Sequence, residues 1–190
     1  MSTHALLQGL LMYGVVPIWL VAGLADYGCH RRSRIEWSSG LKESLLHLLQ
    51  FGLVGVPLLA ALLLEVNAAV LLVMLVMLLL HQAIAVWDVR YANRTRPVSP
   101  LEQHIHGVLE MNPTFGTAIV AILHWDQFIA LFGGGNAVFN LAWKYNSLPA
   151  WYLTLVLVGV LVFGVLPYGE EFLRTWRAAS TKALQPGAVS

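Results

Sequence analysis

Acidic residues and histidines recur together at helical spacing in four separate stretches of this chain. The clearest stretch runs from Pro97 to Pro113, where Glu102, His106 and Glu110 recur every fourth residue and therefore share one face of a helix. Carboxylates and neutral imidazoles, without sulfur, are ligands that suit iron, manganese or zinc. This stretch therefore predicts one wall of a metal site.

Three other stretches repeat the pairing of an acid with a histidine. The pairs are Asp26 with His30, Glu43 with His47, and His81 with Asp88. The first two pairs are four residues apart and the third is seven apart, so the members of each pair share a helix face. The full set of candidate ligands is Asp26, His30, Glu43, His47, His81, Asp88, Glu102, His104, His106 and Glu110. Ten candidates exceed the needs of one tetrahedral zinc ion, which favours two metal ions, iron first, with zinc and manganese as alternatives.

Two of the candidates on the 100–111 stretch have alternative interpretations. Glu102 follows Ser99 by three residues, so S-P-L-E also matches a capping box, in which the carboxylate would bind the backbone. His104 is two residues from His106 and faces another side of the helix. Of these two histidines His106 is the preferred ligand, because Glu110 extends its stripe.

Three further residues are candidates for contacts around the ligands. Arg31 and Arg90 lie beside carboxylates and could hold a ligand carboxylate or an anionic headgroup. His124 lies deep in an apolar stretch, where ionisable residues are usually functional. The alternative for Asp26 and Asp88 is a simple ion pair with a nearby arginine at the membrane surface.

The composition predicts that membrane-spanning helices position these residues. Hydrophobic residues make up 58% of the 190 residues, charged residues only 11%, and the mean hydropathy is +0.69. We expect an all-α polytopic membrane protein that forms one domain over residues 1–190. Its five transmembrane helices are predicted at residues 5–25, 41–64, 68–91, 114–132 and 151–168, with a short cytoplasmic helix at 100–111. The polar tail after residue 168 is expected to fray.

Helix signals set the limits of the short cytoplasmic helix. Ser99 suits the N-cap and Pro100 the first helical position, while Asn112 and Pro113 predict its end. The helix at 114–132 would then begin separately.

The basic residues predict the orientation of this arrangement. Ten of the eleven lysines and arginines lie on one side of the five predicted spans, and only Lys144 lies on the other. The positive-inside rule then places the N-terminus outside and the C-terminus in the cytoplasm of a bacterial-type inner membrane. All four acid and histidine stretches reach the cytoplasmic side. The single cysteine, Cys29, excludes an internal disulfide and a cysteine-rich zinc site, and no basic run with interleaved aromatic residues predicts nucleic-acid binding.

With helices delivering histidine clusters to the cytoplasmic face, the chain resembles in kind the membrane-integral di-iron oxygenases: fatty-acid desaturases, lipid hydroxylases and alkane monooxygenases. The resemblance covers roughly residues 26–110. The H-x-x-x-H and H-x-x-H-H boxes of those enzymes are absent, and the pairs Asp26/His30 and Glu43/His47 stand instead. The mixed ligand set is also similar to that of ferritin-like di-iron carboxylate proteins, without their Glu-x-x-His spacing.

The resemblance implies an O2-dependent hydroxylation or desaturation of a lipid or other apolar substrate that enters from the inner leaflet. Electrons would come from a cytoplasmic partner, because the chain has no G-x-G-x-x-G or C-x-x-C-H motif for a cofactor of its own. Two alternatives stay open at this point. One is a zinc-dependent membrane hydrolase; the other is a transporter or assembly protein in which the acids and histidines relay protons or metal.

Overall fold

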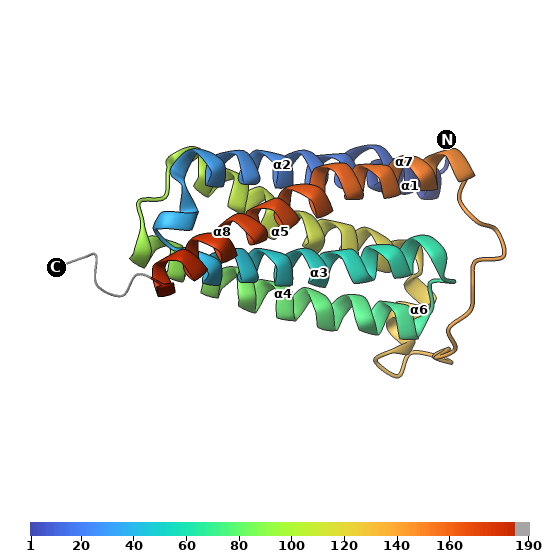
Figure 1. The fold of residues 1–190 in the computed structure, drawn as a ribbon. Coiled ribbons are helices and arrows are strands. Elements are labelled where there is room, and N and C mark those ends of the chain that lie inside the picture. Colours follow the sequence, from blue (N-terminus) through green and yellow to red (C-terminus); the bar gives the residue numbers. More distant parts are fainter. Residues whose placement is uncertain (185–190) are drawn as a thin grey trace.

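The computed structural model describes residues 1–184, which form eight α-helices arranged in an elongated bundle (Figure 1). The helices are α1 Thr3–Leu10, α2 Val16–Ser33, α3 Leu41–Leu63, α4 Ala68–Thr95, α5 Pro100–Leu123, α6 Trp125–Ala130, α7 Ala150–Val160 and α8 Leu166–Leu184. The structure is 82% helical and the described residues contain no strand. The prediction of an all-α fold is confirmed.

Two pairs of helices are joined end to end by a single wide turn. A π-helical turn at Leu11–Val15 connects α1 to α2, and a second at Leu161–Val165 connects α7 to α8. Each turn lies just before a proline, Pro17 or Pro167. Proline lacks the backbone N–H and crowds the preceding turn of the helix, so a locally wider turn lets the rod continue across it.

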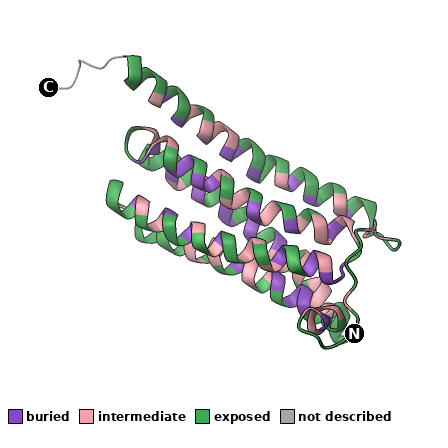
Figure 2. Cartoon of the chain, turned by 90° about the horizontal axis from the view of Figure 1, so that it is seen from below, coloured by how far each residue is buried: buried purple, intermediate pink, exposed green. Residues whose placement is uncertain are grey.

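Four helical segments are long and apolar enough to cross a membrane. They are Thr3–Ser33, Leu41–Leu63, Ala68–Thr95 and Ala150–Leu184. Each exceeds the roughly 20 residues that span a hydrocarbon core of about 30 Å. Large apolar side chains such as Val21, Leu79 and Leu155 are exposed on the outer faces of these segments, where Figure 2 shows long exposed stripes. These are the features of an integral membrane protein.

The predicted break between a short cytoplasmic helix and a following span is wrong. Helix α5 begins at the predicted cap, where the Ser99 hydroxyl accepts a hydrogen bond from the Glu102 amide at 3.2 Å. It then runs through Pro113 without interruption and ends only at His124, after which α6 begins. Because α5 is not among the four segments named above, the number of spans stays a prediction.

Side-chain hydrogen bonds connect α5 to neighbouring segments around its proline. The Asn112 side chain donates to the Val15 carbonyl at 2.9 Å, and the Gln82 side chain donates to the Glu110 carbonyl at 2.9 Å. Gln82 thus donates to the α5 backbone near Pro113, and prolines are tolerated inside membrane helices when neighbouring side chains satisfy the backbone in this way. The Asn112–Pro113 signal is therefore a local one that packing overrides.

The predicted fraying after residue 168 is also wrong for the described residues. Helix α8 continues to Leu184 and packs against α2 and α3 (Figure 1). Two of its polar side chains, Glu171 and Thr175, have no exposed surface at all. Residues 185–190 of the predicted tail lie outside the described residues.

The two ends of the bundle differ in construction. At one end, α2 leads through a short 3-10 turn at Ile35–Trp37 into α3, and α4 leads into α5. At the other end, the Asn67 side chain caps α4. The connection of residues 131–149 packs against the turn between α3 and α4 through backbone hydrogen bonds. The acid and histidine stretches all lie toward the first end.

Candidate metal centre

Nine polar residues from five helices meet inside the bundle, and together they are called the polar cluster here. They are Asp26 and His30 on α2, Glu43 and His47 on α3, Asp88 on α4, Arg96 just after α4, Glu102 and His106 on α5, and Glu171 on α8. Eight of the nine are at most 7% exposed. Three of the helices contribute an acid and a histidine four residues apart, so each presents both from one face.

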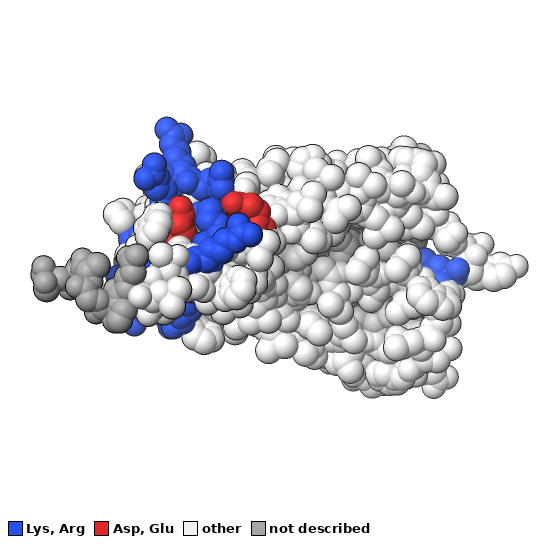
Figure 3. Space-filling view, in the orientation of Figure 1, with Lys and Arg blue, Asp and Glu red and all other residues white. Residues whose placement is uncertain are grey.

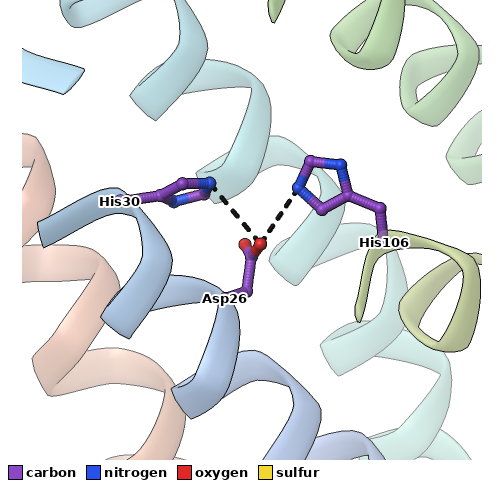
Figure 4. A group of neighbouring side chains, drawn as sticks. All are labelled: Asp26, His30 and His106. Atoms are coloured by element: carbon purple, nitrogen blue, oxygen red, sulfur yellow. Dashed lines mark ion pairs between the residues drawn. The ribbon is translucent and has the colours of Figure 1, made fainter. Parts of the chain in front are cut away.

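Asp26 lies between two histidines that come from different helices. Its Oδ1 is 3.0 Å from Nε2 of His106 and 3.5 Å from Nε2 of His30. Figure 4 shows both imidazoles turned toward this carboxylate. Nε2 of His30 is also 3.4 Å from Oε1 of Glu102. These atoms form the first half of the polar cluster.

The second half is built around His47. Its Nε2 is 3.2 Å from Oδ2 of Asp88 and 3.9 Å from Oε1 of Glu43. The same Glu43 oxygen is also 3.9 Å from Nε2 of His30. Glu43 therefore lies midway between the two halves.

Glu171 joins the two halves from behind. Its Oε2 is 2.9 Å from Nδ1 of His30, and its Oε1 is 2.8 Å from Nδ1 of His47. An ionised carboxylate can only accept hydrogen bonds, so each histidine donates from Nδ1. The lone pair of each Nε2 is then left facing the carboxylates, which is the usual arrangement of a metal-binding histidine held by an acid.

Several nitrogen and oxygen atoms at the centre of the polar cluster are buried and make no hydrogen bond within the described residues. They are Oδ1 of Asp26, Oδ1 of Asp88, and Nε2 of His30, His47 and His106. Buried polar atoms nearly always have a partner. Metal bonds of about 2.0–2.2 Å place neighbouring ligand atoms roughly 3 to 3.5 Å apart, close to the separations given above. The unpartnered atoms thus have the chemistry and spacing of metal ligands.

Arg96 neutralises part of the negative charge. Its Nε donates to Oε2 of Glu43 at 3.2 Å and its Nη1 to Oε2 of Glu102 at 3.1 Å, while Nη2 contacts both carboxylates. Burial alone would raise the pKa of Glu102, but the nearby His30 and the guanidinium of Arg96 hold that pKa well below its usual range. The same two carboxylates outweigh burial and raise the pKa of Arg96.

The charge of the polar cluster calls for further cations. It holds five carboxylates against one guanidinium, which leaves four negative charges if the histidines are neutral. Uncompensated buried charge is strongly destabilising. Protonating all three histidines would still leave one negative charge, whereas two divalent ions would balance all four.

Not every predicted ligand belongs to the polar cluster. His104 is exposed on the outside of α5, two residues from His106. Glu110 is half-buried, and His81 is buried with Nδ1 unpartnered; both line a cavity of about 50 Å³ together with Asp26 and His106.

The residues predicted to surround the ligands lie elsewhere. Arg31 forms an exposed ion pair with Glu170 at 2.7 Å, and Arg90 is exposed. His124 ends α5, toward the opposite end of the bundle. The arginine that does contact the carboxylates is Arg96.

Sequence reasoning missed both Arg96 and Glu171 as site residues. One usable signal for Glu171 was its position two to three residues beyond an apolar stretch that ends on the same side as the other acids. No sequence signal distinguishes Arg96 from the other basic residues of its loop.

Comparison of the chain with protein-family models, curated proteins and solved structures gives no match. Its function has to be inferred from the site.

Proposed function

We propose that the polar cluster binds two metal ions, iron in the active protein, and that the protein is a membrane oxidoreductase. Its reaction would be the hydroxylation or desaturation of a lipid or other apolar substrate. The observation that carries this proposal is the set of buried, unpartnered ligand atoms, together with the four negative charges that remain when the histidines are neutral. Carboxylates with imidazoles inside a helical bundle are the ligand type of di-iron proteins.

The geometry suggests how the ligands divide between two ions. Asp26, His30, Glu102 and His106 would hold the first ion. His47 and Asp88 would hold the second. Oε1 of Glu43 is 3.9 Å from Nε2 of both His30 and His47, so Glu43 would be available to either ion.

Aromatic side chains separate this centre from the surrounding lipid. Phe51 stacks on Trp19 with ring centroids 5.8 Å apart and packs on Tyr168 at 5.5 Å, and Tyr168 in turn lies beside His47. A dry, apolar wall of this kind would hold an apolar substrate and keep water from the reaction. When bound, the ions would supply the activation of O2.

The balance of a hydroxylation requires a partner. One C–H bond and one O2, with two electrons and two protons, give one C–OH bond and one water. The sequence has no G-x-G-x-x-G or C-x-x-C-H motif, so in this proposal the electrons come from a separate donor. Figure 3 shows lysines and arginines gathered at the end of the bundle that holds the polar cluster. We propose that this end is cytoplasmic, with the N-terminus outside, and that the donor binds there.

A zinc hydrolase is the second candidate, and one observation favours it. Asp26, His30 and His106 have ligand atoms within 4.8 Å of one another, as do His30, Glu43 and His47, and the first group has the size of the three-ligand set of a catalytic zinc site. The proposal of two iron ions ranks first because this set leaves the unpartnered atoms of His47 and Asp88 unexplained.

Metal analysis of the purified protein tests the proposal. We expect about two equivalents of iron in the wild-type protein, and about one equivalent in either His106→Ala or His47→Ala. The double variant should bind none. His104→Ala is the matched control, because it removes an exposed histidine from the same helix. Two equivalents of zinc in the wild type would favour the hydrolase. A folded wild-type protein that takes up no metal on reconstitution would overturn the metal centre, leaving a proton or ion relay to explain these residues.

A further inference from the structure

A second, larger cavity lies between the helices and extends from the opposite end of the bundle toward the polar cluster. Its volume is about 300 Å³. It shares three lining residues, Trp19, Val54 and His81, with the small cavity beside the polar cluster. The two cavities are therefore neighbours.

The larger cavity is long rather than round. Along α5 its lining residues run from Asn112 to His124, which is about 18 Å at 1.5 Å per residue. The middle is lined by apolar side chains such as Met74, Leu78 and Val120. This shape and lining fit an extended hydrocarbon chain, and they do not fit a path for ions.

The two ends of the larger cavity are polar in different ways. The far end is lined by His4, His124 and Lys144, and the Lys144 ammonium donates to the Ala61 carbonyl. Among the described residues, Lys144 is the one lysine or arginine that lines this cavity and no carboxylate lines it, so this end favours an anion. At the near end His81 is 4% exposed and its Nδ1 has no partner among the described residues.

We infer that this cavity binds a single-chain amphiphile with an anionic head, such as a fatty-acid carboxylate. The head lies at Lys144 and His124, and the chain runs through the bundle so that its far end meets His81 beside the polar cluster. The role of this molecule as a substrate rests on the proposed function; its binding does not. The orientation presents the end of the chain, and not the carbons near the head, to the metal centre.

Photo-crosslinking of palmitate to the purified protein in detergent tests the orientation. A diazirine at the last carbon should label peptides that contain Trp19, Val54 or His81. A diazirine next to the carboxylate should instead label peptides that contain His124 or Lys144. Excess unlabelled palmitate should suppress both reactions. The opposite pattern, or labelling confined to lipid-facing residues and insensitive to competition, would overturn the inference.

Paired variants test the cavity itself. Leu78→Trp fills its middle and should abolish the competed labelling, whereas Leu79→Trp, at a 70% exposed neighbouring position, should not change it. Lys144→Gln should weaken palmitate binding about tenfold and leave hexadecanol binding unchanged, since only the anionic head loses a charged partner. Equal effects on both probes would overturn the assignment of the head.

Metal content measured on the same samples separates the two proposals. If the protein contains no metal but is labelled, and unlabelled palmitate suppresses this labelling, the amphiphile site is retained and the metal centre is overturned. Two equivalents of metal without competed labelling would overturn the amphiphile site alone.

Discussion

The imidazoles of His30 and His47 lie face to face, with ring centroids 4.4 Å apart and planes inclined by only 4°. They come from α2 and α3, and the Glu171 carboxylate on α8 holds both of their Nδ1 atoms. The two Nε2 atoms are therefore side by side and face the same group of carboxylates. One metal ion could not use both lone pairs along their own directions, whereas two adjacent ions could.

Glu171→Gln should weaken metal binding by about 10- to 100-fold, the usual cost of losing the acid behind a metal-binding histidine. The amide keeps the shape of the side chain but can no longer accept from both imidazoles equally. Competition with a chelator of known affinity measures the effect. Glu170→Gln changes the adjacent residue, whose side chain is 40% exposed, and should bind metal like the wild type. Equal affinities in the two variants would refute the role given to Glu171.

Arg96→Met should destabilise the metal-free protein by about 3–5 kcal/mol, because Glu43 and Glu102 would keep buried charges without their partner. Bound metal should recover part of this loss by supplying positive charge to the same carboxylates. Thermal unfolding with and without metal gives both quantities. Arg94→Met removes an exposed arginine two residues away and should have little effect. If Arg96→Met were as stable as Arg94→Met, the guanidinium would not be needed for charge balance.

Metal binding should weaken as the pH falls. Burial alone would lower the pKa of His106, but contact with the Asp26 carboxylate outweighs burial and raises it. An imidazole must be neutral to bind metal, so affinity is full above this raised pKa and falls as the pH drops through it. Each proton that the metal must displace should lower the metal affinity about tenfold per pH unit below that pKa. Titrations between pH 7.5 and 5.5 measure the slope, which His106→Gln should reduce; an unchanged slope in that variant would contradict the assignment.

Gly164→Ala should disturb the aromatic wall beside the polar cluster. A Cβ at this position would overlap the Phe51 ring, which itself stacks on Trp19. Overpacking of this kind costs about 1–3 kcal/mol. Gly55→Ala on α3 is the control, because nothing lies within 4 Å of its added Cβ. Thermal unfolding compares the two variants, and an equally stable Gly164→Ala protein would show that Phe51 can move freely.

The sequence by itself determined the helices and the local pairing of acids with histidines. Spacing of four residues on a helix places Asp26 beside His30 and Glu43 beside His47 whatever the rest of the chain does. The apolar length of the surrounding stretches determined that these pairs sit in long helices. The choice of His106 over His104 also followed from helical periodicity, and the structure places His106 inside and His104 outside.

Only the tertiary structure decided which distant groups complete the site. Glu171 lies more than a hundred residues from both histidines that it orients, and no local spacing links them. Arg96 reaches Glu43 only because α3 and α4 pack side by side. Helix α5 continues through Pro113, where Gln82 of α4 donates to the Glu110 carbonyl and Asn112 links the helix to Val15, and a local stop signal cannot anticipate these contacts. Burial, charge balance and hydrogen-bond satisfaction are properties of the packed bundle, so they were decided only when the helices came together.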